Sequence, residues 1–203
     1  VVLSGDDVCY ITDARIAIDC AAIFLTELEK YKVLGEKITA CAGIAMVREK
    51  YPFFKTYELS EELCRAAKAS IPDDANESRI DWHIVQGEYN NLNEVRSKDY
   101  KTYDGKELLL RPLIVSEDAE AINTYANFKK DMQLIRSDKV AASKIKNMIK
   151  EMRKGEEYLD IYIKINRLNP LIKSHRTEGK TGFIDGKCVW FDAIETMDYY
   201  IPL

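Results

Sequence analysis

A run of eleven nearly uncharged residues, from Lys37 to Val47, constrains the fold of this chain more than any other feature. Its sequence, K-I-T-A-C-A-G-I-A-M-V, is β-rich and made largely of small residues, which suits a strand buried on both faces. Gly43 lies inside the run, and a glycine within a strand predicts that a neighbouring backbone approaches closely. The run therefore predicts the central strand of a sheet.

Strand and helix patterns alternate on both sides of this run. Two short apolar stretches flank the turn Ser4-Gly5-Asp6-Asp7, a pattern typical of a β-hairpin with acidic residues at its tip. Apolar residues at helical spacing predict two helices, and alternating apolar residues predict a last strand. The elements are expected at residues 1–3, 8–11, 14–31, 37–47, 56–69 and 79–87. This β-β-α-β-α-β order predicts an α+β sheet with helices on one face.

The second half of the chain has a different pattern. Residues 88–110 are polar and rich in Tyr and Asn, and are expected to form an excursion or loop. The rest is predicted to be mainly helical, with a hairpin around Asp185-Gly186. The helices are expected at residues 116–135, 138–154, 157–168 and 192–200. We therefore expect two domains, 1–110 and 111–203.

Composition narrows the functional classes. The 203 residues carry a net charge of −4, which argues against coating nucleic acid by charge alone. No apolar run reaches the ~18–20 residues that span a bilayer, so no membrane partner is expected. The five cysteines include no C-x-x-C pair, which favours free thiols in a reducing, cytoplasmic compartment. Residues 136–180 hold twelve basic and six acidic side chains, a surface for RNA or an acidic subunit, or simply a solvated face.

The strongest local signal for chemistry is Gly5-Asp6-Asp7 at the predicted hairpin tip. Two adjacent carboxylates on a tight turn can hold Mg²⁺ or Mn²⁺, because hard cations bind carboxylate oxygens and substrate phosphates together. The alternative is that the aspartates stabilise the turn through local hydrogen bonds, as Asp commonly does. The turn alone leaves both interpretations open.

The order of three motifs resembles that of the palm-type nucleotidyl cyclases. These include the GGDEF diguanylate cyclases and, most similar, the second palm domain of the polymerase-like large subunit of type III CRISPR effector complexes. Gly5-Asp6-Asp7 matches the last three residues of the G-G-D-D motif. The strand at 38–45 is similar to the family's V-T-x-S-x-G-V-A strand, and the helix around Leu59–Lys68 resembles its helix ending in A-K. The resemblance covers roughly residues 1–87 and implies a ferredoxin-like palm with an antiparallel sheet.

The resemblance implies roles for these residues. Asp6 and Asp7 would bind Mg²⁺ or Mn²⁺ at the triphosphate of ATP or a related nucleotide, and Lys68 would neutralise charge in the transition state. Ser4 and Gly5 would border the nucleotide, and Gly5 would keep the turn open. Ser4 replaces the first glycine of the motif, which would tighten the pocket. The family's first strand, with its own aspartate, is absent before the hairpin, so the sheet should have an open edge or a partner chain beside it.

Three functions compete at this stage. The first is the C-terminal portion of a CRISPR-associated polymerase or cyclase that makes cyclic or short oligonucleotides in antiviral defence, with RNA or effector subunits as partners. The second is an inactive palm that serves as a nucleotide sensor or as a structural platform in a ribonucleoprotein, which Ser4 and the absent strand favour. The third is a diguanylate cyclase relative, against which Asp7 counts, because those enzymes carry glutamate there. The fragment alone is expected to be inactive.

Several other residues have both a structural and a functional interpretation. Lys68 alone would be a solvated lysine favoured by the helix dipole. His83, on a predicted strand, is expected to be structural. The aromatic residues at 51, 53, 54 and 57 are expected to fill the core between sheet and helix, with base stacking as the alternative.

Overall fold

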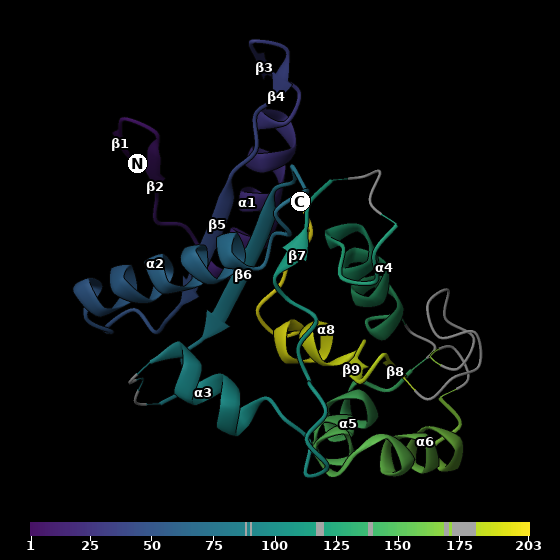
Figure 1. Ribbon diagram of the computed structural model, residues 1–203. Coiled ribbons are helices and arrows are strands. Elements are labelled where there is room, and N and C mark those ends of the chain that lie inside the picture. Colours follow the sequence, from purple (N-terminus) through teal and green to yellow (C-terminus); the bar gives the residue numbers. More distant parts are fainter. Residues whose placement is uncertain (88, 90, 117–119, 138–139, 169–170, 172–181) are drawn as a thin grey trace.

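The computed structural model describes the chain except residues 88, 90, 117–119, 138–139, 169–170 and 172–181, together with the side chains of Leu3 and Ser4. It is an α+β fold, as predicted (Figure 1). The helices are α1 (Ala14–Leu28), α2 (Phe53–Ala69), α3 (Leu92–Asp99), α4 (Tyr125–Ile135), α5 (Ala142–Lys154), α6 (Glu156–Ile165) and α8 (Phe191–Thr196). The strands are β1 (Val2–Ser4), β2 (Asp7–Cys9), β3 (Lys32–Val33), β4 (Glu36–Lys37), β5 (Cys41–Met46), β6 (Arg79–Ile84), β7 (Leu113–Ile114), β8 (Phe183–Ile184) and β9 (Lys187–Cys188).

The main sheet is mixed, which corrects the prediction of an antiparallel sheet. Its order is β5-β6-β7, with β5 parallel to β6 and β7 antiparallel to β6. The reason is the connection: α2 crosses over between β5 and β6, and such a crossover joins parallel strands. The predicted β-α-β order is therefore right, but its two strands, β5 and β6, run parallel and not antiparallel.

Strand β5 forms one edge of this sheet within the described part of the chain. The N–H of Val85 donates to the carbonyl of Met46 at 2.9 Å, so the backbone groups of Met46 face β6. Because strand residues alternate, the backbone groups of Cys41, Gly43 and Ala45 face the open side instead. The expected open edge is thus present at β5.

Helices cover both faces of the sheet, so the prediction of helices on one face is wrong. On the face toward α1, Ala42 and Ile44 of β5 pack against the main hydrophobic cluster. On the other face, Gly43 lies against α2, where an added Cβ would overlap the carbonyl oxygen of Ser60 and the backbone nitrogen of Cys64. The close backbone approach predicted at Gly43 is therefore confirmed.

The hairpin of β1 and β2 is a separate two-stranded sheet (Figure 1). Ser4 pairs with Asp7, so Gly5 and Asp6 are the two central turn residues. Gly5 has φ = +64°, which suits the first central position of a type II′ turn, where glycine avoids the strain of a Cβ. The predicted hairpin is confirmed, and a Cys9-to-Asp13 connection leads from it into α1.

The second half of the chain packs onto the α1 face of the sheet. One hydrophobic cluster runs from α1 and β6 to α4, α5, α6 and α8, and Trp82 contacts Phe128 edge-on at 5.2 Å between ring centres. The predicted Asp185-Gly186 hairpin is confirmed as β8–β9, with both turn residues at positive φ. The division at residue 110 stays a prediction.

Candidate functional site

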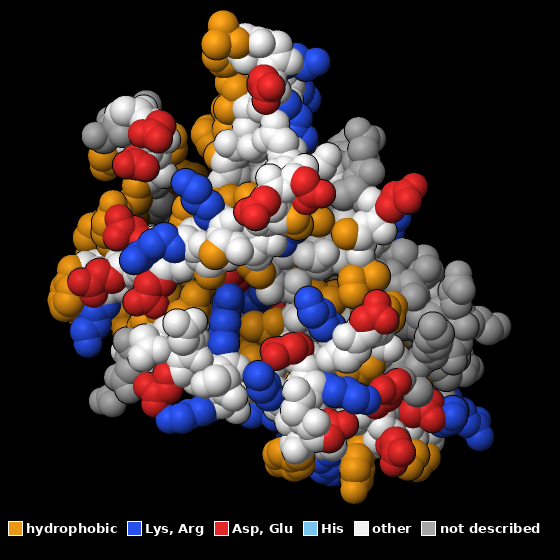
Figure 2. Space-filling model, in the orientation of Figure 1, with side chains coloured by type: hydrophobic (Ala, Val, Ile, Leu, Met, Phe, Trp, Pro, Cys, Tyr) orange, Lys and Arg blue, Asp and Glu red, His pale blue; other side chains and the backbone are white. Residues whose placement is uncertain are grey.

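The predicted acidic tip is exposed. Asp6 and Asp7 both lie at the surface of the hairpin, and within the described residues neither side chain makes a hydrogen bond or ion pair. Figure 2 shows acidic side chains at this tip. Aspartates that stabilise a turn usually accept hydrogen bonds from its backbone, and these two do not. Their carboxylate oxygens are thus available to an external cation.

Lys68 lies in the last turn of α2, where its charge also complements the helix dipole. Its side chain is exposed, and within the described part of the chain it has no carboxylate partner. Several surface lysines do reach a carboxylate, as Lys154 does with Glu151 at 2.9 Å, but among the described residues Lys68 does not. Lys68 is therefore a cation that remains available to a ligand.

The pKa of the Cys64 thiol depends on the charges of both Asp7 and Lys68. Cys64 lies one helical turn before Lys68 and donates from Sγ to the carbonyl of Cys41 at 3.2 Å. Burial raises the pKa of this thiol, the charges of Asp7 and Glu61 raise it further, and Lys68 lowers it. A carboxylate and an ammonium group that act on the same thiol must both lie near it. Asp7 and Lys68 thus both lie within electrostatic range of α2 at Cys64, while no hydrogen bond or ion pair joins them within the described residues.

The aromatic residues at the start of α2 correct one prediction. Tyr51 packs against the smaller hydrophobic cluster that includes Leu59 and Leu63, as expected of a core residue. Phe53, Phe54 and Tyr57 are instead exposed, because the helix begins at Phe53 and turns them outward. Glu61 accepts a hydrogen bond from Tyr57 and, with the charge of Asp7, raises the pKa of Tyr57. The exposed ring of Tyr57 thus lies within electrostatic range of Asp7, and a base could stack on such a ring.

The donors at the tip fit a hard cation in part. Mg²⁺ is commonly bound by one or two carboxylates together with substrate phosphates and water, and Asp6 and Asp7 supply that number. Among the described residues, no group of three or more His, Cys, Asp or Glu side chains could hold a metal ion. A metal at this tip would therefore depend on the phosphates of a bound nucleotide, or on a further carboxylate beyond the described residues.

A second group of charged residues was not predicted. The buried Asp81, on β6, accepts from Nη2 of Arg96 on α3 through both oxygens, at 2.7 and 2.8 Å. Nε of Arg111 lies 3.9 Å from Asp81. Nη1 of Arg111 donates to Glu195 at 2.8 Å and to Asp192 at 3.1 Å, both on α8. These five residues, here called the buried charge cluster, join β6, α3, the segment before β7, and α8.

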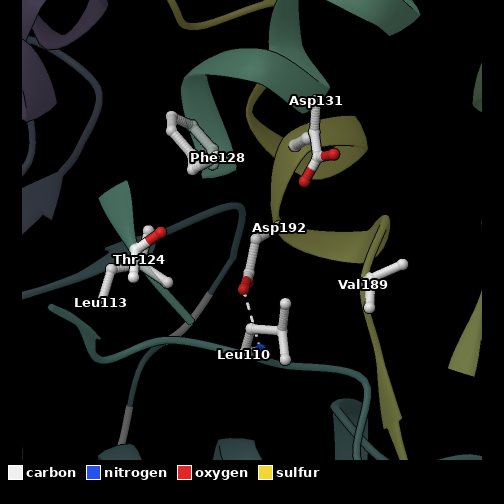
Figure 3. A pocket seen from close by; sticks show the side chains of 8 residues that line it. Leu110, Leu113, Thr124, Phe128, Asp131, Val189 and Asp192 are labelled. Atoms are coloured by element: carbon white, nitrogen blue, oxygen red, sulfur yellow. Dashed lines mark hydrogen bonds between the residues drawn. The ribbon is translucent and has the colours of Figure 1, made fainter. Parts of the chain in front are cut away.

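Burial and charge set the protonation states in this cluster. Burial opposes the charge of Arg111, but Glu195 and Asp192 more than offset this effect and raise its pKa. Burial raises the pKa of Asp192, while Arg111 and the backbone N–H of Leu110 lower it (Figure 3). Burial and the nearby Arg111 lower the pKa of His83 to about 4, so this histidine is neutral at pH 7. The cluster is built to hold its charges, and its role is structural.

Sequence signals for this cluster existed. Asp81 interrupts the apolar alternation of β6, and a carboxylate inside a strand with every residue buried needs a cation. Arg111 follows three leucines, which places a charged group at the end of an apolar run. These two positions predict an ion pair, although its partners on α8 lie about eighty residues away in sequence.

Two cavities in the described part of the molecule are lined by residues away from the hairpin tip. One of about 10 Å³, between α4 and α8, is lined by residues that include Asp192, Asp131 and Phe128, and holds a single water at most (Figure 3). A shallow groove of about 360 Å³ is lined by Thr26, Val115, Tyr125, Ala126 and Lys129. Neither is lined by a predicted site residue.

Comparison with known proteins gives no identity for this chain. No protein-family model matches it, and no curated protein matches it significantly. Within the described residues, no helix is both long and apolar enough to cross a membrane. The function must therefore be argued from the site itself.

Proposed function

We propose that this chain is an α+β module that binds ATP or a related nucleoside triphosphate, with Mg²⁺ or Mn²⁺, at the tip of the β1–β2 hairpin. In this proposal it is the C-terminal portion of a CRISPR-associated polymerase or cyclase that makes cyclic or short oligonucleotides. Asp6 and Asp7 hold the metal, Lys68 contacts the phosphates, and Ser4 and Gly5 border the nucleotide.

One observation carries the proposal: Asp6 and Asp7 lie exposed at the hairpin tip, and neither carboxylate has a hydrogen-bond or ion-pair partner among the described residues. A triphosphate with a divalent ion needs carboxylates for the metal and a cation for the phosphates, close together. Their exposure also means that binding costs little desolvation of the protein groups. The exposed Tyr57, within electrostatic range of Asp7, adds a ring on which a base can stack.

When bound, divalent metal ions activate the 3′-hydroxyl of one nucleotide and stabilise the pyrophosphate that leaves the other. The side chains of this chain do the rest. Lys68 stabilises negative charge that grows on the phosphates in the transition state. Gly5, with no Cβ, leaves room at the tip for the triphosphate, and nothing described lies within 4 Å of the position a Cβ would take.

The test is a titration of the full chain with ATP and Mn²⁺, which reports binding by calorimetry and turnover by pyrophosphate release. The double variant Asp6→Asn/Asp7→Asn should abolish metal-dependent binding. Lys68→Met should weaken ATP binding by about tenfold, the loss of one charge-assisted contact. The matched control is Asp73→Asn/Asp74→Asn, a second exposed acidic pair in the loop after α2. Equal loss in both double variants would contradict the proposal.

The second candidate function is a nucleotide sensor or structural platform without catalysis. The open edge of β5 favours it, because the backbone groups of Gly43 and Ala45 face the edge rather than β6. A strand from a partner could pair there and join the chain to a larger complex. Metal-dependent binding of ATP without pyrophosphate release would support the sensor. An absence of any binding would leave the platform alone.

A further inference from the structure

Helix α6 carries apolar side chains on two opposite faces. Leu159 and Ile163 are buried in the main hydrophobic cluster. Tyr158, Ile161 and Ile165 lie on the outer face with 54%, 54% and 74% of their surface exposed. Their spacing of three and four residues places them in one stripe. A surface helix normally has one apolar stripe and one polar face, so the outer stripe of α6 is unusual for a helix that contacts solvent alone.

A loop beside the start of α6 presents one more exposed aromatic side chain. The N–H of Tyr103 donates to the carbonyl of Arg153 at 2.9 Å, which holds this loop beside the junction of α5 and α6. Asp104 also lies there, 3.2 Å from the position that a Cβ on Gly155 would take. The ring of Tyr103 is 85% exposed. Figure 2 shows apolar side chains along this rim of the molecule. Large apolar side chains exposed along one rim indicate an interaction site.

The charges that flank the stripe are self-complementary. Glu157 and Lys164 are seven residues apart, so they lie two turns apart on the same flank of the stripe. Lys164 now reaches Asp160 within the helix at 2.6 Å, in an exposed pair that contributes little to stability. If a second α6 packs antiparallel around a twofold axis, residues on the same flank of the two helices meet. Glu157 of each copy then faces Lys164 of the other.

We propose that the outer face of α6 is a contact between two copies of this chain. The two helices pack antiparallel, with the twofold axis next to Ile161, so that Tyr158 packs against Ile165 of the partner subunit. Such an isologous contact uses one patch twice. One ten-residue helix and a loop form an interface at the small end of the range for specific complexes. The dimer is therefore weak and depends on concentration. The proposal does not rest on the nucleotide site.

Sedimentation equilibrium of the full chain tests this contact. The wild-type chain should show a reversible monomer–dimer equilibrium with a dissociation constant on the order of micromolar to hundreds of micromolar. Ile161→Glu should raise this constant by about a hundredfold, because two carboxylates then face each other across the axis. The matched control is Ile23→Glu on α1, where the isoleucine is similarly exposed (48%). A monomer at every concentration, or a dimer that persists in Ile161→Glu, would overturn the proposal.

Charge reversal tests the antiparallel orientation. Glu157→Lys and Lys164→Glu, each alone, place like charges opposite each other and should weaken the dimer by about tenfold. The double variant restores opposite charges and should recover wild-type dimerisation. Failure of the double variant to recover would overturn the antiparallel arrangement, provided that its urea midpoint matches that of the wild type. These substitutions lie at exposed positions, so they should not prevent folding.

Discussion

The replacement Arg111→Met removes the central cation of the buried charge cluster. Methionine has a similar length and no charge, so the change leaves the volume nearly filled and isolates the electrostatic effect. In the wild type, the guanidinium group is fully buried and donates to Asp192 and Glu195 at 3.1 and 2.8 Å. It also lies over the ring of Trp82, 4.9 Å from the ring centre. The substitution leaves three carboxylates with only Arg96 as a cation.

The expected loss of unfolding free energy depends on which hydrogen bonds each carboxylate retains after Arg111 is replaced. Asp81 retains both hydrogen bonds from Arg96, and Glu195 retains the hydroxyl of Tyr100 at 2.7 Å. Asp192 retains the backbone N–H groups of Leu110 and residue 111, at 2.8 and 3.1 Å, but no positive charge. Breaking a buried ion pair by removing one partner costs about 3–5 kcal/mol of unfolding free energy. The retained hydrogen bonds place the expected loss at the lower end, about 3 kcal/mol.

The loss should depend on pH. Burial raises the pKa of Asp192 in the folded state, and Arg111 opposes that rise. Without Arg111 the folded-state pKa rises further above its unfolded value of about 3.9. The folded state then binds a proton more readily than the unfolded state, so the unfolding free energy decreases as the pH rises through the folded pKa. Arg111→Met should therefore cost more at pH 8 than at pH 5.

Urea denaturation followed by tryptophan fluorescence measures this loss, because Trp82 and Trp190 are both buried. The control is Lys146→Met, which breaks an ion pair between Lys146 and Asp198 whose side chains are half exposed, and should cost under about 1 kcal/mol. Adding Asp192→Asn to Arg111→Met should restore part of the stability. A cost no greater than that of Lys146→Met, or one that grows as the pH falls, would show that Arg111 does not stabilise the buried carboxylates.

Two further stability predictions concern the sheet. His83→Phe should flatten the acid limb of the stability curve, because a histidine whose pKa is lowered from 6.5 to about 4 destabilises the fold as the pH falls between these values, by up to about 3 kcal/mol. Urea midpoints at pH 7 and pH 4.5 check it, and an unchanged slope would contradict it. Gly43→Ala should cost about 3 kcal/mol or fail to fold, since the new Cβ would overlap backbone atoms of Ser60 and Cys64. A melting temperature within a degree of the wild type would contradict that close approach.

Local patterns predicted most elements because short-range physics determines them. The Gly5-Asp6 and Asp185-Gly186 turns need positive φ, and glycine supplies it at both hairpins. The first helix begins where predicted because Asp13 accepts from the N–H of Arg15 at 2.9 Å and caps it. These signals depend on neighbours within a few residues. Correct predictions of these turns and this helix start give no information about which distant elements pair.

The errors arose where distant residues decide the structure. Residues 92–99 form α3 in a segment expected to be a loop, because Asn91 caps it and Arg96 reaches the buried Asp81 fifteen positions earlier. The predicted helix over 116–135 forms only from Tyr125 on, capped by Thr124, and residues 117–119 of that prediction lie outside the described residues. Pairing direction in the sheet depends on whether β5 and β6 become neighbours, because the α2 crossover between them then makes them parallel. Composition and periodicity do not show which distant side chains meet or which strands pair.

The same long-range limit applies to the candidate site. The sequence placed Asp6 and Asp7 on a turn and Lys68 near a helix end, and the structure agrees on each local position. Whether they act together depends on how the hairpin lies relative to α2, which is set by contacts between residues far apart in the sequence. The buried charge cluster shows the converse case, since its acidic and basic side chains pair with one another inside the fold.

The open edge of β5 and the isolation of the β1–β2 hairpin have one structural consequence. A strand that paired with β5 would use the outward backbone groups of Gly43 and Ala45, which now face no strand in the described structure. If the same strand also paired with β2, it would join the hairpin to the main sheet and hold Asp7 in a fixed position relative to Lys68. Fixing two ligands before binding reduces the entropy cost of capturing the metal and the phosphates. Affinity for a metal–nucleotide complex at the tip should therefore rise when the β5 edge is occupied, and binding at one place should protect the other from hydrogen exchange.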